Sequence, residues 1–146
     1  ATVGQSMTAL TSARATDAQV AAVRSLMDSV GRTILIDEDY FPVFQALASC
    51  SPAWYFQIID TFARAGLKYG LSKDSAVEIA AQAMAGAATL LLAEREAGTI
   101  PAQLIDRVTS PGGTTIAGLL AAEEGGLSNA LVGAVDASIH ADSHLG

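Results

Sequence analysis

The stretch Ser72–Glu96, SKDSAVEIAAQAMAGAATLLLAERE, decides the fold class, because its apolar residues cover nearly the whole circumference of a helix. Ser72 is a favoured N-cap, and a helix of ~25 residues is about 37 Å long. A helix that is apolar all round is a buried helix. Since 146 residues can hardly surround a helix of this length, we expect a second copy to cover it. Its small residues, which let neighbouring helices approach closely, are Ala80, Ala83, Gly86 and Ala87.

Helix signals also dominate the rest of the chain from Tyr40 onward. Ser51-Pro52 reads as an N-cap followed by proline at the first helical position, which predicts a helix to about Gly70. Pro101 begins a shorter helix, and residues 116–122 form another that ends at two glycines. Apolar residues at helical spacing from Leu127 to about His144 predict the last one. Residues 40–146 are therefore predicted to form one helical domain.

The first 39 residues show a different pattern, strand, helix, strand. Met7–Thr11 and Thr33–Asp37 have strand character. Between them, Thr16-Asp17-Ala18-Gln19 is a capping box at the start of a helix that Gly31 ends. Two short strands and one helix are not stable alone. Residues 1–39 are therefore predicted to be the remnant of a nucleotide-binding domain, and the start at Ala1 favours a fragment. No GxGxxG motif follows either strand, so no cofactor-binding residue is expected here.

The composition and net charge of the chain limit which binding partners and which cellular compartment we expect. The net charge of −7 argues against nucleic acid, which needs a basic face. Only 16% of the residues are charged, compared with about 25% in ordinary soluble domains, and 51% are hydrophobic. This again favours a dimer. The single cysteine, Cys50, excludes an internal disulfide and fits a reducing, cytoplasmic setting. We find no signal peptide and no run of ~18 apolar residues, so no membrane span is expected.

The stretch Ser110–Ile116, SPGGTTI, is the best candidate for a ligand site. Ser110 before Pro111 reads as an N-cap with proline at the first helical position. The N–H groups of Gly112, Gly113 and Thr114 would then be first-turn donors without an intrahelical acceptor. The glycines let an anion approach closely, and the hydroxyls of Ser110, Thr114 and Thr115 add donors. A carboxylate or phosphate suits such a helix start, although a Gly-Gly joint without a ligand fits the local sequence equally well.

Other candidate residues are weaker. His140 and His144 lie one helical turn apart, but a metal site would need a third ligand, and solvated surface is the better interpretation. Cys50 precedes a predicted helix, where a thiol pKa can be lowered, yet no histidine is near in sequence, so a small core residue is favoured. We therefore predict no metal site.

Three long stretches together resemble pyrroline-5-carboxylate reductases, which catalyse the last step of proline biosynthesis. The most specific is VTSPGGTTIAGLLAAEEGGLSNALVGAVDAS (Val108 to Ser138). The others are ARAGLKYGLSKDSAVEIAAQAMAGAATLLL (Ala63 to Leu92) and DAQVAAVRSLMDSVGRTILIDED (Asp17 to Asp39). The resemblance implies a mainly α fold: a helical dimerisation domain, like the C-terminal domain of 6-phosphogluconate dehydrogenase, after a short β-α-β remnant of a Rossmann domain.

The resemblance also implies an activity, reduction of the cyclic imine 1-pyrroline-5-carboxylate to L-proline by hydride from NADPH or NADH. The substrate carboxylate is then held by the segment Ser110–Thr115, with Ser110 as the carboxylate-binding serine. Gly112, Gly113 and Thr114 belong to the same substrate-binding segment, and Thr115 matches the family's threonine near the imine nitrogen. The implied partner is a second copy with intertwined helices, with a higher oligomer left open. This chain is expected to bind no cofactor and to be inactive alone.

The chain also departs from the family pattern. Ala48-Ser49-Cys50-Ser51-Pro52-Ala53-Trp54 stands where Ser-Gly-Ser-Gly-Pro-Ala-Tyr is usual, the segment Glu94–Thr99 is longer, and Arg107 replaces a frequent asparagine. Two alternatives therefore stay open at this point. One is a helical dimerisation module without catalysis, and the other is a related imine or β-hydroxyacid dehydrogenase.

Overall fold

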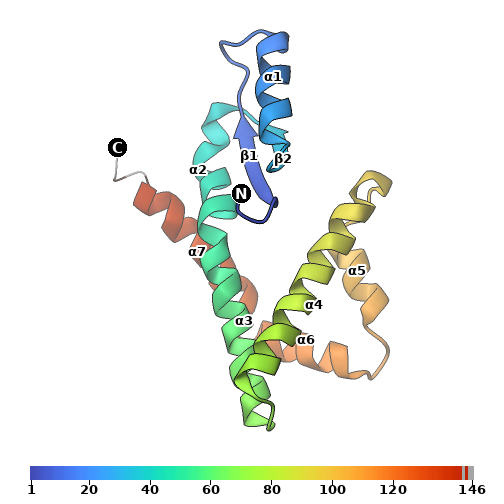
Figure 1. Ribbon diagram of the computed structural model, residues 1–146. Helices are drawn as coiled ribbons and strands as arrows, with labels where there is room; N and C mark the ends of the chain where they lie inside the picture. The colour runs from blue at the N-terminus through green and yellow to red at the C-terminus, as the bar shows by residue number, and fades with distance from the viewer. Residues whose placement is uncertain (143, 145–146) are drawn as a thin grey trace. The chain divides into compact units, whose positions relative to one another are not determined.

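The computed structural model describes residues 1–142 and residue 144. Its elements follow the predicted order, two strands around one helix and then helices only (Figure 1), so the mainly α fold class is confirmed. Contacts divide the chain into two compact units. Unit 1 comprises residues 1–52 and the described residues from 133 onward, and unit 2 comprises residues 53–132. The division at residue 39 into two domains stays a prediction.

Unit 1 contains the predicted β-α-β segment. Strands β1 (Ser6–Leu10) and β2 (Gly31–Leu35) pair in parallel, with Thr8 opposite Thr33. Helix α1 (Asp17–Met27) connects them, and the capping box is present: the Gln19 N–H donates to the Thr16 hydroxyl at 3.3 Å, and the Thr16 N–H donates to Gln19 Oε1 at 2.9 Å. A Cβ on Gly31 would collide with the backbone of Ser6. Glycine therefore permits the close approach that starts the strand pair.

The first long α-helix begins at Ser51 as predicted, but the N-cap role predicted for Ser51 is wrong. A 3₁₀ turn (Glu38–Tyr40), α2 (Phe41–Gln45), a π-helical segment (Ala46–Cys50) and α3 (Ser51–Lys68) follow one another without a break. Ser51 is therefore inside a helical run, where its hydroxyl donates to the Leu47 carbonyl at 2.6 Å. Pro52 has no N–H to offer that carbonyl in the π register, so the Ser51 hydroxyl supplies the missing donor.

Unit 2 is helical throughout its ordered elements. After α3 come α4 (Lys73–Glu94), a 3₁₀ turn (Arg95–Ala97), α5 (Pro101–Val108) and α6 (Thr114–Glu124). Helix α7 (Leu127–Asp142) begins in this unit and continues in unit 1. The predicted cap of α4 is confirmed, because the Ser75 N–H donates to the Ser72 hydroxyl at 3.2 Å.

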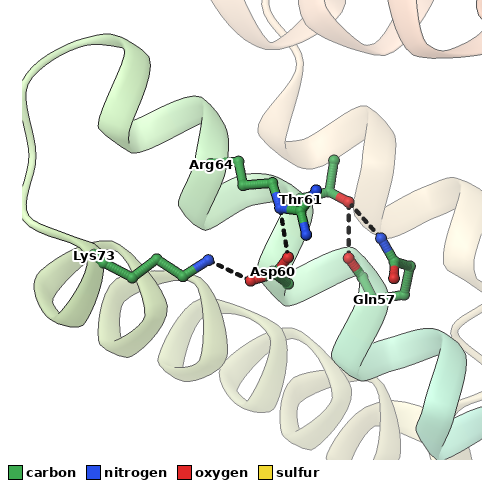
Figure 2. Close-up of polar contacts among 5 residues, drawn as sticks. All are labelled: Gln57, Asp60, Thr61, Arg64 and Lys73. Carbon is green, nitrogen blue, oxygen red and sulfur yellow. Dashed lines mark hydrogen bonds and ion pairs between the residues drawn. The ribbon is translucent and has the colours of Figure 1, made fainter.

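Helices α3 and α4 form a close hairpin. A Cβ built on Gly66 would lie 2.8 Å from the Cβ of Ala76, so glycine allows the two helices to touch. Near the same end, Asp60 accepts from Arg64 Nε at 2.7 Å and from Lys73 across the hairpin (Figure 2). On α3, Thr61 and Gln57 are one turn apart and are joined by hydrogen bonds: the Thr61 hydroxyl donates to the Gln57 carbonyl, and the Gln57 amide donates to the Thr61 hydroxyl (Figure 2). Apolar contact and one ion-pair cluster thus join the two helices.

The described chain buries very little of its apolar surface. Its buried hydrophobic residues are three alanines, Ala46, Ala63 and Ala76, and no large side chain is fully buried among the residues described. The accessible surface is 10786 Å², whereas a compact monomer of this mass exposes about 7,000 Å². Helix α4 has one buried residue, Ala76, although it is apolar all round. The expectation that the chain cannot cover this helix by itself is confirmed.

The helical segment Lys73–Ala97 has 25 residues and contains an 18-residue window with a mean hydropathy of 1.6, so it is long and apolar enough to cross a membrane. Polar residues such as Gln82 and Thr89 interrupt its apolar positions, so the segment is not an uninterrupted apolar run. Length and composition alone do not distinguish a spanning helix from the core helix of a soluble assembly.

The ion pairs of Asp60 with Arg64 and Lys73 should make the stability of the hairpin sensitive to acid. The hydrogen bond from Lys73 lowers the pKa of the Asp60 carboxyl below its ordinary value of 3.8; desolvation opposes this shift, and the charge of Arg64 adds to it. Because the folded-state pKa is the lower one, the stabilisation is complete above the unfolded-state pKa and is lost as the pH falls through the folded-state pKa. Asp60→Asn should therefore lower the melting temperature slightly at pH 7 and not at all at an acidic pH below the folded-state pKa of Asp60.

Thermal denaturation at the two pH values checks this expectation. Asp136→Asn, at an exposed position of α7, is the matched control and should melt like the wild type at both pH values. An equal loss for Asp60→Asn at both pH values would mean that the carboxylate charge is not what stabilises the hairpin.

Candidate functional site

The segment between α5 and α6 folds as a tight turn. The Gly113 N–H donates to the Ser110 carbonyl at 2.9 Å. Pro111 occupies the second position, and Gly112 occupies the third with a φ of +69°. This is the residue pattern of a type II turn, in which the third residue needs positive φ. The first glycine therefore has a backbone reason to be present.

The second glycine lies at the helix boundary. Gly113 is the N-cap of α6, with extended backbone and no side chain to form a cap. A Cβ at Gly113 would collide with the Ser110 hydroxyl, so glycine lets that hydroxyl lie directly against the helix start. The two glycines thus have different roles: Gly112 adopts the positive φ of the turn, and Gly113 allows the close approach of Ser110.

The predicted N-cap at Ser110 is wrong. Positive φ at Gly112 prevents the helix from starting before it, and the turn uses the N–H of Gly113. The first intrahelical bond to the cap runs from the Ala117 N–H to the Gly113 carbonyl at 3.3 Å. The N–H groups without an intrahelical acceptor are therefore those of Thr114, Thr115 and Ile116, about two residues later than predicted.

The structure nevertheless brings the predicted residues together. Ser110, Gly112, Gly113, Thr114 and Thr115 form one turn and the helix start that follows it. The side chains of Ser110, Thr114 and Thr115 are exposed, and no side-chain hydrogen bond caps α6. Exposed hydroxyls beside first-turn N–H groups are suited to a small carboxylate or phosphate. The roles assigned to each residue stay predictions.

Sequence reasoning missed a polar cluster next to this turn. We call it the Glu94 cluster: Glu94, Thr99 and Arg107. Arg107 Nη1 donates to both carboxylate oxygens of Glu94, at 2.8 and 2.7 Å, and the Thr99 hydroxyl donates to Oε2 at 3.0 Å. The hydrogen bond from Arg107, and then the one from Thr99, lowers the pKa of the Glu94 carboxyl. The only sequence signals were the long segment Glu94–Thr99 and the unusual Arg107.

Unit 1 has a separate groove at the carboxyl ends of β1 and β2. It has a volume of about 500 Å³ and is bordered by residues 11–13 and 35–38. Parallel α/β sheets bind ligands at this edge. The segment after β1 contains no glycine, however, and Asp37 and Glu38 follow β2. These residues do not fit a dinucleotide pyrophosphate, which needs close backbone approach and no facing carboxylates.

The two histidines and the cysteine contribute no further site. His140 and His144 lie with ring centroids 5.3 Å apart, and the His140 carbonyl is 2.7 Å from His144 Nδ1. Within residues 1–142 and 144, no three metal-ligating side chains gather. Cys50 is partly buried in the π-helical segment.

Comparison with known proteins agrees with this arrangement. Residues 38–145 match the family described as pyrroline-5-carboxylate reductase dimerisation. The pyrroline-5-carboxylate reductase of Treponema pallidum is 41% identical over 119 residues, which cover 82% of this chain and 44% of the relative.

Two solved structures extend the likeness over nearly the whole chain. The pyrroline-5-carboxylate reductase of Coxiella burnetii gives a TM-score of 0.90 at 30% identity, covering 99% of this chain and 53% of that one. The Plasmodium falciparum enzyme, solved with NADP bound, gives 0.78 at 25% identity over 92% of this chain and 50% of that one. The chain thus spans about half the length of the relatives that it matches. It belongs to the pyrroline-5-carboxylate reductase family, and residues 38–145 correspond to the family's dimerisation domain.

Proposed function

We propose that this chain is the substrate-binding and dimerisation part of a reductase that converts 1-pyrroline-5-carboxylate to L-proline in the cytoplasm. The proposal rests on one observation above all: within the family match, the Ser110–Gly113 turn delivers exposed hydroxyls and unpaired N–H groups to one point at the start of α6. The relatives' names supply the substrate and the reaction.

The chemistry of the turn suits the proposed substrate. A carboxylate is stabilised by the N–H groups of Thr114, Thr115 and Ile116 and by the positive end of the α6 dipole. The Ser110 hydroxyl, which lies directly against Gly113, adds a further donor. With the carboxylate held there, the hydroxyl of Thr115 is the group that we assign to the imine nitrogen, to which it donates a hydrogen bond.

The complete enzyme, in our proposal, uses NADPH or NADH, as the NADP-bound relative suggests. The cofactor supplies the hydride. The residues that border the groove at β1 and β2 do not fit a dinucleotide, so we assign cofactor binding to the part of the relatives' length that this chain does not span.

We further propose that the chain works as a homodimer. The argument is the uncovered apolar surface of unit 2, since large exposed patches mark interaction sites. An apolar groove of about 620 Å³ runs along α4 and is bordered by Tyr55, Met84, Ala87, Leu91 and Leu104. Helices of a second copy are the occupant that the family match favours over a lipid bilayer or a nucleic acid.

Substituting Thr115 in the intact enzyme tests the proposed function. Thr115→Ala should lower kcat/KM for pyrroline-5-carboxylate at least ~10-fold, because one hydrogen bond to a polar transition state is worth about 1.4 kcal/mol or more. Thr114→Ala is the comparison variant and should have a smaller effect, because the N–H of residue 114, which we assign to the carboxylate, is kept in alanine. Steady-state oxidation of NADPH measures both variants. Equal and negligible effects would make the turn a purely structural joint.

A further inference from the structure

The Glu94 cluster joins two helix ends. Glu94 is the last residue of α4, and Arg107 lies in the last turn of α5. Both carboxylate oxygens are occupied: Arg107 Nη1 donates to each of them, and Thr99 donates to one. Thr99 is only 7% exposed, although it lies in the connection between the helices. The Thr99 donor is buried, and both oxygens of the Glu94 carboxylate accept hydrogen bonds. These two features distinguish the cluster from an isolated surface ion pair, whose geometry is seldom fixed.

Helix α5 depends on this cluster for its position. None of its residues is buried, so apolar packing holds it weakly. Its first half lies along the groove beside α4, which Pro101 and Leu104 border. Its last turn is tied to α4 through Arg107. Without the hydrogen bonds of Arg107, α5 would contact α4 through its first half alone, and its last turn would be free to shift.

The end of α5 determines where the turn begins. Only Val108 and Thr109 separate Arg107 from Ser110, so the Cα atoms of Arg107 and Ser110 lie at most about 11 Å apart. The Thr109 hydroxyl donates to the Ile105 carbonyl at 3.0 Å, which stiffens this junction. A shift of the last turn of α5 therefore moves Ser110 and the turn with it.

We propose that Glu94 and Arg107 are positioning residues for the substrate carboxylate. They act through α5 on the Ser110–Gly113 turn and on the first-turn N–H groups of α6, without touching the substrate. This inference rests on the proposed function. Because the turn holds the carboxylate, misplacing it should weaken substrate binding and leave cofactor binding unchanged. In kinetic terms, KM for pyrroline-5-carboxylate rises while KM for NADPH stays the same.

A double-mutant cycle in the intact reductase tests the proposal. Arg107→Ala and Glu94→Ala should each raise KM for pyrroline-5-carboxylate by roughly 5- to 10-fold, and the double variant by no more than either one. Arg107→Lys should restore part of the loss. Arg95→Ala is the matched control, since this arginine follows Glu94 directly, is exposed and belongs to the 3₁₀ turn. It should leave both KM values unchanged.

Amide hydrogen exchange supplies a readout that does not depend on activity. The Gly113 N–H is bonded to the Ser110 carbonyl, so it should exchange faster in Arg107→Ala than in the wild type or in Arg95→Ala. Multiplying effects in the double variant would mean that Arg107 contacts the substrate itself and would overturn the proposal. So would unchanged KM together with unchanged exchange at Gly113. A wild type without turnover would defeat the proposed function, while the exchange data would still decide whether the cluster positions the turn.

Discussion

Ala87→Asp should convert a soluble assembly into aggregated or unfolded protein. Ala87 is exposed at the middle of α4 and borders the apolar groove, so in a dimer of this family it is expected to lie under helices of the second copy. A buried, unpaired carboxylate costs several kcal/mol. Such a loss is comparable with the whole stability of a small domain, which is about 5–15 kcal/mol. A soluble monomer is not the expected product, because the chain has almost no core of its own.

Sedimentation velocity and far-ultraviolet circular dichroism of the purified chain measure this effect. Gln82→Asp is the matched control, because it places the same charge on the same helix at a position that is already polar and exposed. The control should keep the size and helix content of the wild type. Wild-type behaviour of Ala87→Asp would show that the surface around Ala87 is not covered.

Gly66→Val should break the α3–α4 hairpin. The Cβ of any residue at position 66 meets the Cβ of Ala76 at 2.8 Å, closer than two such carbons pack. Neither atom can rotate away, because both are attached directly to helix backbone, so the helices must separate. Overpacking of this kind costs about 1–3 kcal/mol. We expect the upper part of that range, since Ala63 and Ala76 beside it are two of the three buried hydrophobic residues described.

Urea denaturation of the wild type, Gly66→Val and Gly118→Val checks this expectation. Gly118 is also inside a helix, but nothing in the described chain lies within 4 Å of an added Cβ there. The same substitution should therefore change the free energy of unfolding by less than about 0.5 kcal/mol. Equal effects at the two positions would mean that helix propensity, and not close packing at Gly66, decides the outcome.

Helix starts could be predicted from the sequence where the local residue pattern is compatible with a single structure. The Thr16 capping box and the Ser72 cap are confirmed. The N-caps predicted at the two serine–proline pairs are both wrong for the same physical reason. Proline has a fixed φ that suits the first position of a helix, the second position of a turn and a helix continued after a π-helical segment. Ser110-Pro111 begins a turn and Ser51-Pro52 continues a helix. The neighbouring residues, not the pair itself, decide among these structures.

The Glu94 cluster could not be predicted for a different reason. Glu94 and Arg107 are 13 residues apart, and they meet only because residues 95–100 turn back so that α5 lies beside α4. Sequence periodicity reports which residues share a face of one helix, but not which helix ends meet. The five residues of the predicted substrate segment, in contrast, lie within six consecutive positions, Ser110–Thr115, so their proximity required no knowledge of the tertiary structure.

Sedimentation equilibrium of the wild-type chain at micromolar concentration, without substrate or cofactor, tests the central claim most directly. An obligate interface exceeding about 2,000 Å² persists under such conditions, so we expect a species of twice the chain mass of 14.9 kDa. A stable, soluble species of 14.9 kDa would contradict it.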